Sequence, residues 1–107
     1  MQLTTAQLDR ACGVLLATAA GDALGAGYEF GPALPDSTPV TMRGGGGFGW
    51  APGEWTDDTS MAIAIGEAAA TGADLRHLSV QDSIVGRWVE WAHTANDVGV
   101  QIIEQRE

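Results

Sequence analysis

The sequence predicts an all-α fold, and three observations support that prediction. Apolar residues recur at the 3.6-residue helical period in three separate segments. Each of these segments begins at a residue typical of a helix N-cap, and the second ends at a glycine. No segment shows the alternation of apolar and polar residues that a half-buried strand requires. We therefore expect one small helical domain over residues 1–107.

The first helix is predicted to begin at Thr4. Gln7 follows three residues later, which is the spacing of a capping box. Glycines and alanines are dense towards the end of this segment and lower its helix propensity. Small side chains allow another backbone to approach closely, so we expect this helix to be central in the fold. Asp22 lies within this small-residue strip, and a buried structural acid and a functional acid are equally open interpretations of it.

Residues 30–52 are predicted to form a long loop. All four prolines of the chain and the glycine-rich stretch Gly44–Gly49 fall within it. Loops of this length are usually functional or disordered, and glycines allow backbone amides to approach a ligand. The glycines are not a phosphate-binding P-loop, because no Gly-Lys-Ser/Thr follows them. A mobile linker remains the alternative.

Two further helices follow the loop. The second is predicted from about Thr56 to Gly72, with small and apolar residues on one face. The third is predicted to begin at Ser79, with Asp82 three residues later, and carries two tryptophans at helical spacing that we assign to the core. A turn at residues 96–99 precedes what resembles the start of another helix at residues 100–107.

The turn that opens the second helix is a candidate metal site. Thr56, Asp57 and Asp58 offer hard oxygen ligands, which favour Mg²⁺, Mn²⁺ or Ca²⁺. Successive helical residues point about 100° apart, so the two aspartates can share one ion only where the chain enters the helix. The alternative is plain N-capping, because Thr and Asp are also what helix N-termini prefer.

The composition excludes several classes of function. The formal charge is −9, with 14 acidic residues against five arginines and no lysine, which argues against binding a nucleic-acid backbone. The single cysteine, Cys12, excludes an internal disulfide and gives no sign of an oxidising compartment. No long uninterrupted apolar run or secretory signal is present. We expect a cytoplasmic protein that does not contact membranes.

Three motifs together resemble the N-terminal part of the ADP-ribosylglycohydrolase family, of the type that activates dinitrogenase reductase. They are Gly21-Asp22-Ala23-Leu24-Gly25 with Glu29-Phe30, then Pro52 to Met61 around Thr56-Asp57-Asp58-Thr59, then Asp97-Val98-Gly99. The resemblance implies an all-α hydrolase that removes ADP-ribose from a modified protein side chain, arginine in the best-known members. It also implies a binuclear Mg²⁺ or Mn²⁺ site.

The resemblance also implies roles for individual residues. Thr56, Asp57 and Asp58 match the first set of metal ligands of the family. Glu29 matches an acid at the substrate pocket and Asp97 an acid beside the bound ribose, so either is a candidate catalytic residue. The Gly44–Gly49 loop matches the segment that leads into the metal turn.

The chain also departs from the family pattern. The second set of ligands, an Asp-x-Asp-Thr motif near the C-terminus of complete members, is absent. We therefore expect a partial domain with an incomplete metal site and an exposed apolar face. Alternatives are a non-catalytic module that binds ADP-ribose or a nucleotide, an inactive structural fragment, or one half of an enzyme that a second chain completes.

Overall fold

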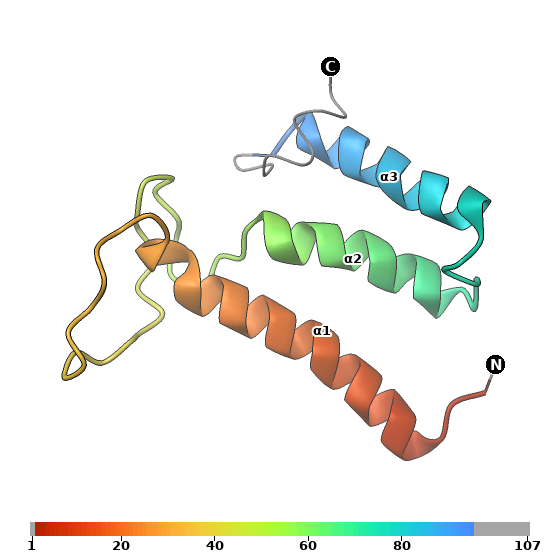
Figure 1. Ribbon diagram of the computed structural model, residues 1–107, viewed down its shortest axis with the longest axis horizontal. Helices are drawn as coiled ribbons and strands as arrows, with labels where there is room; N and C mark the ends of the chain where they lie inside the picture. The colour runs from red at the N-terminus through yellow and green to blue at the C-terminus, as the bar shows by residue number, and fades with distance from the viewer. Residues whose placement is uncertain (1, 96–107) are drawn as a thin grey trace.

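The structure, a computed structural model, describes residues 2–95 and consists of a single layer of helices. Four helical elements follow in order: α1 (Thr5–Gly25), the 3₁₀ helix η1 (Ala26–Tyr28), α2 (Asp57–Ala70) and α3 (Leu78–Ala92). The three α-helices lie side by side in chain order, with α2 in the middle (Figure 1). The layer is thin, since the shortest of its three extents is 19 Å. The described residues contain no strand, which confirms the all-α prediction.

Helix α1 begins as the sequence predicts. The backbone N–H of Gln7 donates to Thr4 Oγ1 at 3.1 Å, and the backbone N–H of Thr4 donates to Gln7 Oε1 at 2.9 Å, which completes the capping box. By length and composition alone, Thr5–Tyr28 is apolar enough to cross a membrane. Buried core helices of water-soluble proteins and N-terminal signal sequences meet the same criterion, so one such helix is weak evidence for a membrane span.

The prediction that α1 is central is wrong for the described residues, where it forms one edge of the layer (Figure 1). Its C-terminal half packs small residues against the rest of the chain, and Ala23 is buried, as is Ala26 at the start of η1. Its larger side chains lack cover, and Leu8, Val14 and Leu16 are 54%, 65% and 71% exposed. The small residues of α1 therefore allow close packing against one neighbouring segment, and other helices do not surround α1 within the described residues.

That close contact joins η1 to the glycine-rich loop. A Cβ at Gly27 would lie only 2.1 Å from the carbonyl oxygen of Gly44, so the two backbones touch without side chains between them. The loop closes on itself through two hydrogen bonds between Gly45 and Trp50, at 2.6 and 3.0 Å. The glycines therefore allow the backbones of η1 and the loop to touch, and the folded loop places Trp50 near the start of α2.

The Tyr28 side chain of η1 and the Arg43 side chain of the loop join η1 to the long loop. The Tyr28 hydroxyl donates to the carbonyl oxygen of Thr41 at 2.9 Å and accepts from its N–H at 3.0 Å. The Arg43 guanidinium stacks 4.2 Å from the centre of the Tyr28 ring and donates to the carbonyl oxygen of Gly27. These contacts hold the loop against the C-terminal end of α1.

Helices α2 and α3 form the second half of the layer. Gly72, with a φ of +82°, follows the end of α2 as predicted. The indole N–H of Trp88 donates to the carbonyl oxygen of Met61 at 3.0 Å, and Arg87 forms an ion pair with Glu67. Trp88 and Trp91 are half-buried, consistent with a packing role.

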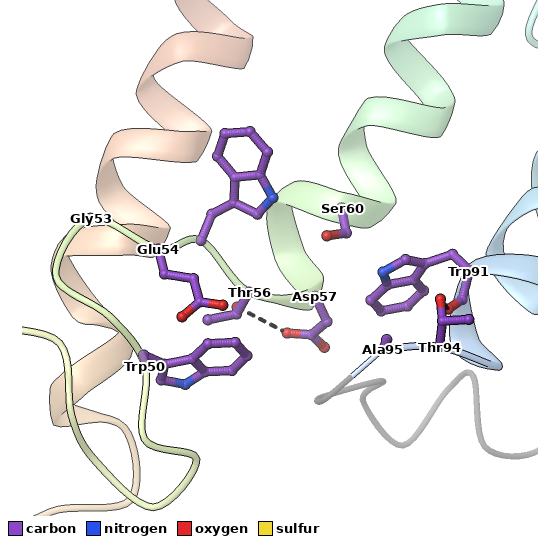
Figure 2. A pocket seen from close by; sticks show the side chains of 10 residues that line it. Trp50, Gly53, Glu54, Thr56, Asp57, Ser60, Trp91, Thr94 and Ala95 are labelled. Carbon is purple, nitrogen blue, oxygen red and sulfur yellow. Dashed lines mark hydrogen bonds between the residues drawn. The ribbon is translucent and has the colours of Figure 1, made fainter.

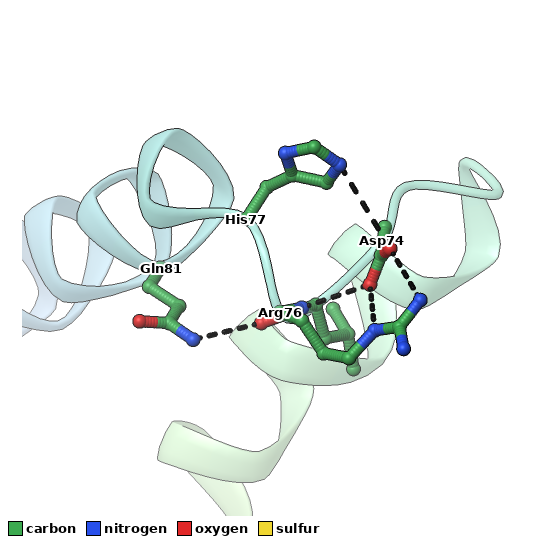
Figure 3. Close-up of polar contacts among 5 residues, drawn as sticks. Asp74, Arg76, His77 and Gln81 are labelled. Carbon is green, nitrogen blue, oxygen red and sulfur yellow. Dashed lines mark hydrogen bonds and ion pairs between the residues drawn. The ribbon is translucent and has the colours of Figure 1, made fainter.

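The prediction that Ser79 caps α3 is wrong, because α3 begins at Leu78 with His77 as the N-cap residue. The connector before it is organised by Asp74, whose carboxylate accepts three hydrogen bonds from the backbone and side chain of Arg76 (Figure 3). These bonds hold the pKa of Asp74 below its ordinary value. This turn sets the N-cap two residues earlier than the capping pattern suggests, at His77 and not at Ser79.

Replacing Gly27 with alanine tests the contact between η1 and the loop. The added methyl group would overlap a backbone carbonyl that no rotamer change can move, so Gly27→Ala should lower the free energy of unfolding by about 1–3 kcal/mol or more. Gly21→Ala is the matched control, because a Cβ there meets nothing within 4 Å, and it should raise stability by about 1 kcal/mol. Urea unfolding of wild type and both variants measures these free energies of unfolding. Equal stabilities of the two variants would contradict the contact between Gly27 and Gly44.

Candidate metal centre

The candidate metal centre is the turn that opens α2. Thr56 is the N-cap residue in an extended conformation, and Asp57 and Asp58 occupy the first helical turn. The Thr56 side chain makes no capping hydrogen bond to its own helix. Side-chain capping by Thr56 is therefore not observed, but Thr56 is the N-cap residue and Asp57 and Asp58 lie in the first turn, as the alternative of ordinary N-terminal residues expects.

Asp22 of α1 caps α2 in place of Thr56. Its Oδ2 accepts the backbone N–H of Thr56 at 2.8 Å and that of Thr59 at 3.1 Å. The two threonine hydroxyls also donate to this carboxylate, Thr56 to Oδ1 at 2.6 Å and Thr59 to Oδ2 at 2.7 Å. Both threonines are buried, each 4% exposed. One carboxylate thus holds both ends of the Thr56–Thr59 turn.

The charge of Asp22 is stabilised by these bonds. Partial burial raises the pKa of its carboxyl group, but the four hydrogen bonds from Thr56 and Thr59 outweigh burial and lower the pKa below its ordinary value of 3.8. Asp22 is therefore ionised at neutral pH. A negative charge at the N-terminus of α2 is also favoured by the helix dipole.

The Thr56 hydroxyl lies between two carboxylates. Its Oγ1 is 2.6 Å from Asp22 Oδ1 and 3.1 Å from Asp57 Oδ1, and Figure 2 draws the second contact. A hydroxyl carries one hydrogen, and the shorter distance is typical of a charge-assisted O–H···O⁻ bond. The hydrogen therefore points to Asp22, and the remaining lone pairs of Oγ1 lie near Asp57.

This oxygen pair fits the chemistry of a hard divalent cation. Ligands at 2.0–2.1 Å in an octahedral Mg²⁺ shell lie about 3 Å apart along each edge, close to the 3.1 Å between Thr56 Oγ1 and Asp57 Oδ1. Asp58 is exposed on the same turn. Within residues 2–95, however, no group of three or more His, Cys, Asp or Glu is placed to hold a metal. The turn supplies part of a coordination shell.

A hollow of about 440 Å³ lies beside this turn. Trp50 and Trp91 stand on either side of it, with the Asp57 carboxylate between them (Figure 2). Its acidic lining residues are Glu54 and Asp57, and no basic side chain lines it among the described residues. The Trp50 side chain is buried and its Nε1 has no hydrogen-bond partner there. The hollow therefore combines aromatic walls with negative charge.

The remaining candidate residues lie elsewhere. Glu29 follows η1 directly and is exposed, and it does not line the hollow. Asp97, with the predicted turn at residues 96–99 and the helix start at 100–107, lies outside the described residues. The roles assigned to Glu29 and Asp97 by resemblance stay predictions.

Asp22 and Thr59 were missed as site residues by the analysis of the sequence. Asp22 had a signal, because it is the one charged residue within a strip of glycines and alanines. Thr59 belongs to the Thr56-Asp57-Asp58-Thr59 motif, but nothing in that motif indicates a contact with Asp22. Their contact spans 37 positions of sequence, which local patterns do not reveal.

Comparison with known proteins assigns the chain to a family. The family model described as ADP-ribosylglycohydrolase matches residues 3–106, nearly the whole chain. The chain therefore belongs to the ADP-ribosylglycohydrolase family, as the motifs predict.

Individual relatives agree with this assignment. The chain is 42% identical over 92 residues to the ADP-ribosylarginine hydrolase Tri1 of Pseudomonas putida (strain GB-1), covering 85% of this chain and 24% of that protein. It is 44% identical over 82 residues to Tri1 of Serratia proteamaculans (strain 568), covering 76% and 22%. It is 42% identical over 71 residues to the ADP-ribosyl-[dinitrogen reductase] glycohydrolase of Rhodospirillum rubrum, covering 63% and 24%. The chain spans about a quarter of the length of these relatives.

The pH dependence of stability tests the cap formed by Asp22. Because its pKa is lower in the folded chain than the ordinary 3.8, the folded state binds fewer protons there than the unfolded state. This contribution to stability should be complete above pH 3.8 and should be lost as the pH falls through the folded pKa. Urea unfolding from about pH 6 to 2.5 measures it.

Two variants isolate the effect of Asp22 from that of other acids. Asp22→Asn should flatten the decline in stability below about pH 4, whereas Asp9→Asn, at an exposed position on α1, should leave it unchanged. An unchanged pH profile in Asp22→Asn would contradict the cap.

Proposed function

We propose that the polypeptide carrying this chain is a metal-dependent hydrolase that removes ADP-ribose from modified protein side chains, arginine in particular. The observation that carries the proposal is the Thr56–Asp57 oxygen pair, 3.1 Å apart, at the mouth of a hollow with acidic and aromatic walls. The family assignment and the names of the Pseudomonas and Serratia relatives support it.

Thr56, Asp57 and Asp58 would hold a first Mg²⁺ or Mn²⁺ ion, and a second ion would need ligands beyond this turn. When bound, the ions would orient the ribose hydroxyls and acidify a water molecule. Both preferred metals take oxygen ligands, which is the donor type that these three side chains offer.

Carboxylates around the hollow would assist cleavage at the anomeric carbon. Breaking that bond builds oxocarbenium-like positive charge on the ribose, and nearby negative charge lowers the energy of such a state. Asp57 and Glu54 line the hollow. Glu29 and Asp97 are the candidates for a general base or for further charge stabilisation, and we do not divide those roles between them.

The hollow also suits the modified arginine. A guanidinium is a planar cation that stacks on indole faces and pairs with carboxylates. Trp91 is half-buried and lines the same hollow as Glu54 and Asp57 (Figure 2), so an indole and a carboxylate face the space that the cation would enter. This combination favours arginine over an uncharged acceptor side chain.

The uncovered faces of α1 indicate that further structure packs there. Leu8, Val14 and Leu16 are all more than half exposed, and exposed apolar surface of this extent usually marks an interface. We infer that further helices of the family fold cover α1, either in the same polypeptide or in a second chain. A native mass spectrum would distinguish these two arrangements.

A second candidate function is ADP-ribose binding without turnover. The described residues favour it in one respect, since they hold no group of three or more His, Cys, Asp or Glu side chains placed to bind a metal. A binder of this kind would keep its ligand in the absence of metal.

Replacing both aspartates of the turn separates the two functions. Asp57→Asn with Asp58→Asn should abolish metal-dependent release of ADP-ribose from an arginine-modified protein, because two charged oxygen ligands are lost. Asp9→Asn with Asp82→Asn, at exposed positions on α1 and α3, is the charge-matched control and should keep full activity. Product release is measured by chromatography with Mg²⁺, with Mn²⁺ and with a chelator.

Two results would contradict the proposed hydrolase. One is no release of ADP-ribose by the intact polypeptide with either metal. The other is activity that persists in the double variant or in the chelator. Retained, metal-independent binding of ADP-ribose without product would establish the second candidate instead.

A further inference from the structure

Asp22 contacts the metal turn at the two positions that flank its aspartates. Thr56 precedes Asp57 and Thr59 follows Asp58, and each donates both its backbone N–H and its hydroxyl to the Asp22 carboxylate. All four donor–acceptor distances lie between 2.6 and 3.1 Å. No other side chain of residues 2–95 makes as many hydrogen bonds to this turn in the structure.

These bonds decide where the Thr56 hydrogen points. If Thr56 donated to Asp57, the hydrogen would occupy the space between the two oxygens and exclude a cation from their shared edge. Donation to Asp22, at 2.6 Å against 3.1 Å, frees that space. It also leaves two oxygens with lone pairs about one octahedral edge apart, an arrangement that a cation would stabilise.

We propose that Asp22 is a positioning residue for the metal. Its carboxylate accepts the hydrogen bond of the Thr56 hydroxyl, so that the lone pairs of Thr56 Oγ1, together with Asp57, face a divalent cation. This inference rests on the proposed metal-dependent function. It assigns Asp22 no contact with the metal or the substrate. The carboxylate acts through Thr56 alone.

A purely structural cap makes a different prediction. If Asp22 only stabilised the start of α2, any variant that weakens the cap would weaken metal binding in proportion to lost stability. If Asp22 orients the hydroxyl, the loss should depend on which threonine is affected. Asn at position 22 has a single acceptor oxygen, which should face the three donors at the Oδ2 position, and its NH₂ group would then face the Thr56 hydroxyl and could not accept its hydrogen bond.

The test compares Asp22→Asn with Thr59→Val. The second variant removes one hydroxyl bond to Asp22 but leaves the Thr56 hydroxyl bonded to it. Mn²⁺ affinity is measured by electron paramagnetic resonance, with thermal melts recorded for every variant. Asp22→Asn should bind Mn²⁺ about 10- to 100-fold more weakly than wild type, the range seen when groups that orient ligands are removed. Thr59→Val should bind close to wild type even where its melting point falls.

Two outcomes overturn the inference. The first is wild-type Mn²⁺ affinity in folded Asp22→Asn, and the second is an equal loss of affinity in both variants. Absence of Mn²⁺ binding in the wild-type protein itself would overturn the proposed metal site and this inference with it, which distinguishes the two failures.

A measurement on the wild-type protein covers the case in which Asp22→Asn does not fold. In NMR spectra, added Mg²⁺ should shift the signals of Thr56 and Asp57, while the Thr56 hydroxyl hydrogen stays bonded to Asp22. Loss of that hydrogen bond on Mg²⁺ binding, or no shift at Thr56, would overturn the inference.

Discussion

The carboxylate of Asp22 is the interaction on which the described structure depends. It joins α1 to the first turn of α2 across 34 and 37 positions of sequence, and it satisfies backbone donors that a helix N-terminus otherwise leaves unpaired. Hydrogen bonds to a charged group contribute about 1.5–3 kcal/mol each, more than neutral ones. Four such bonds in one place make this contact a strong constraint in an otherwise thin layer of helices.

A second tertiary contact, between the backbones of η1 and the glycine-rich loop, also positions residues beside this turn. Gly27 and Gly44 touch without side chains between them, which brings the glycine-rich loop under η1 and delivers Trp50 to the edge of the hollow. A loop is usually the least fixed part of a domain, yet here Tyr28 and Arg43 bind it to the end of α1. The Thr56–Thr59 turn and Trp50 are therefore held in place by two tertiary contacts, whereas Asp57 and Trp91 are positioned by the helices that carry them.

Local structure was predictable from the sequence, and tertiary structure less so. The Thr4–Gln7 capping box and Gly72 after α2 depend on neighbouring residues, so their patterns identify them. The start of α3 was missed because Asp74 organises the connector before it. The prediction that α1 is central was wrong because small residues indicate close packing against one neighbouring segment, and do not indicate that a helix is surrounded by others. The candidate oxygen ligands at Thr56, Asp57 and Asp58 were recognisable by type, whereas the contact of this turn with Asp22 was not.

A double-mutant cycle between Asp22 and Thr59 tests the central claim most directly. The free energies of unfolding of wild type, Asp22→Ala, Thr59→Val and the double variant give the coupling energy of the two side chains. A charge-assisted bond at 2.7 Å predicts a coupling of about 1.5–3 kcal/mol. Effects that add to within about 0.5 kcal/mol would contradict the account, because the two side chains would then be independent.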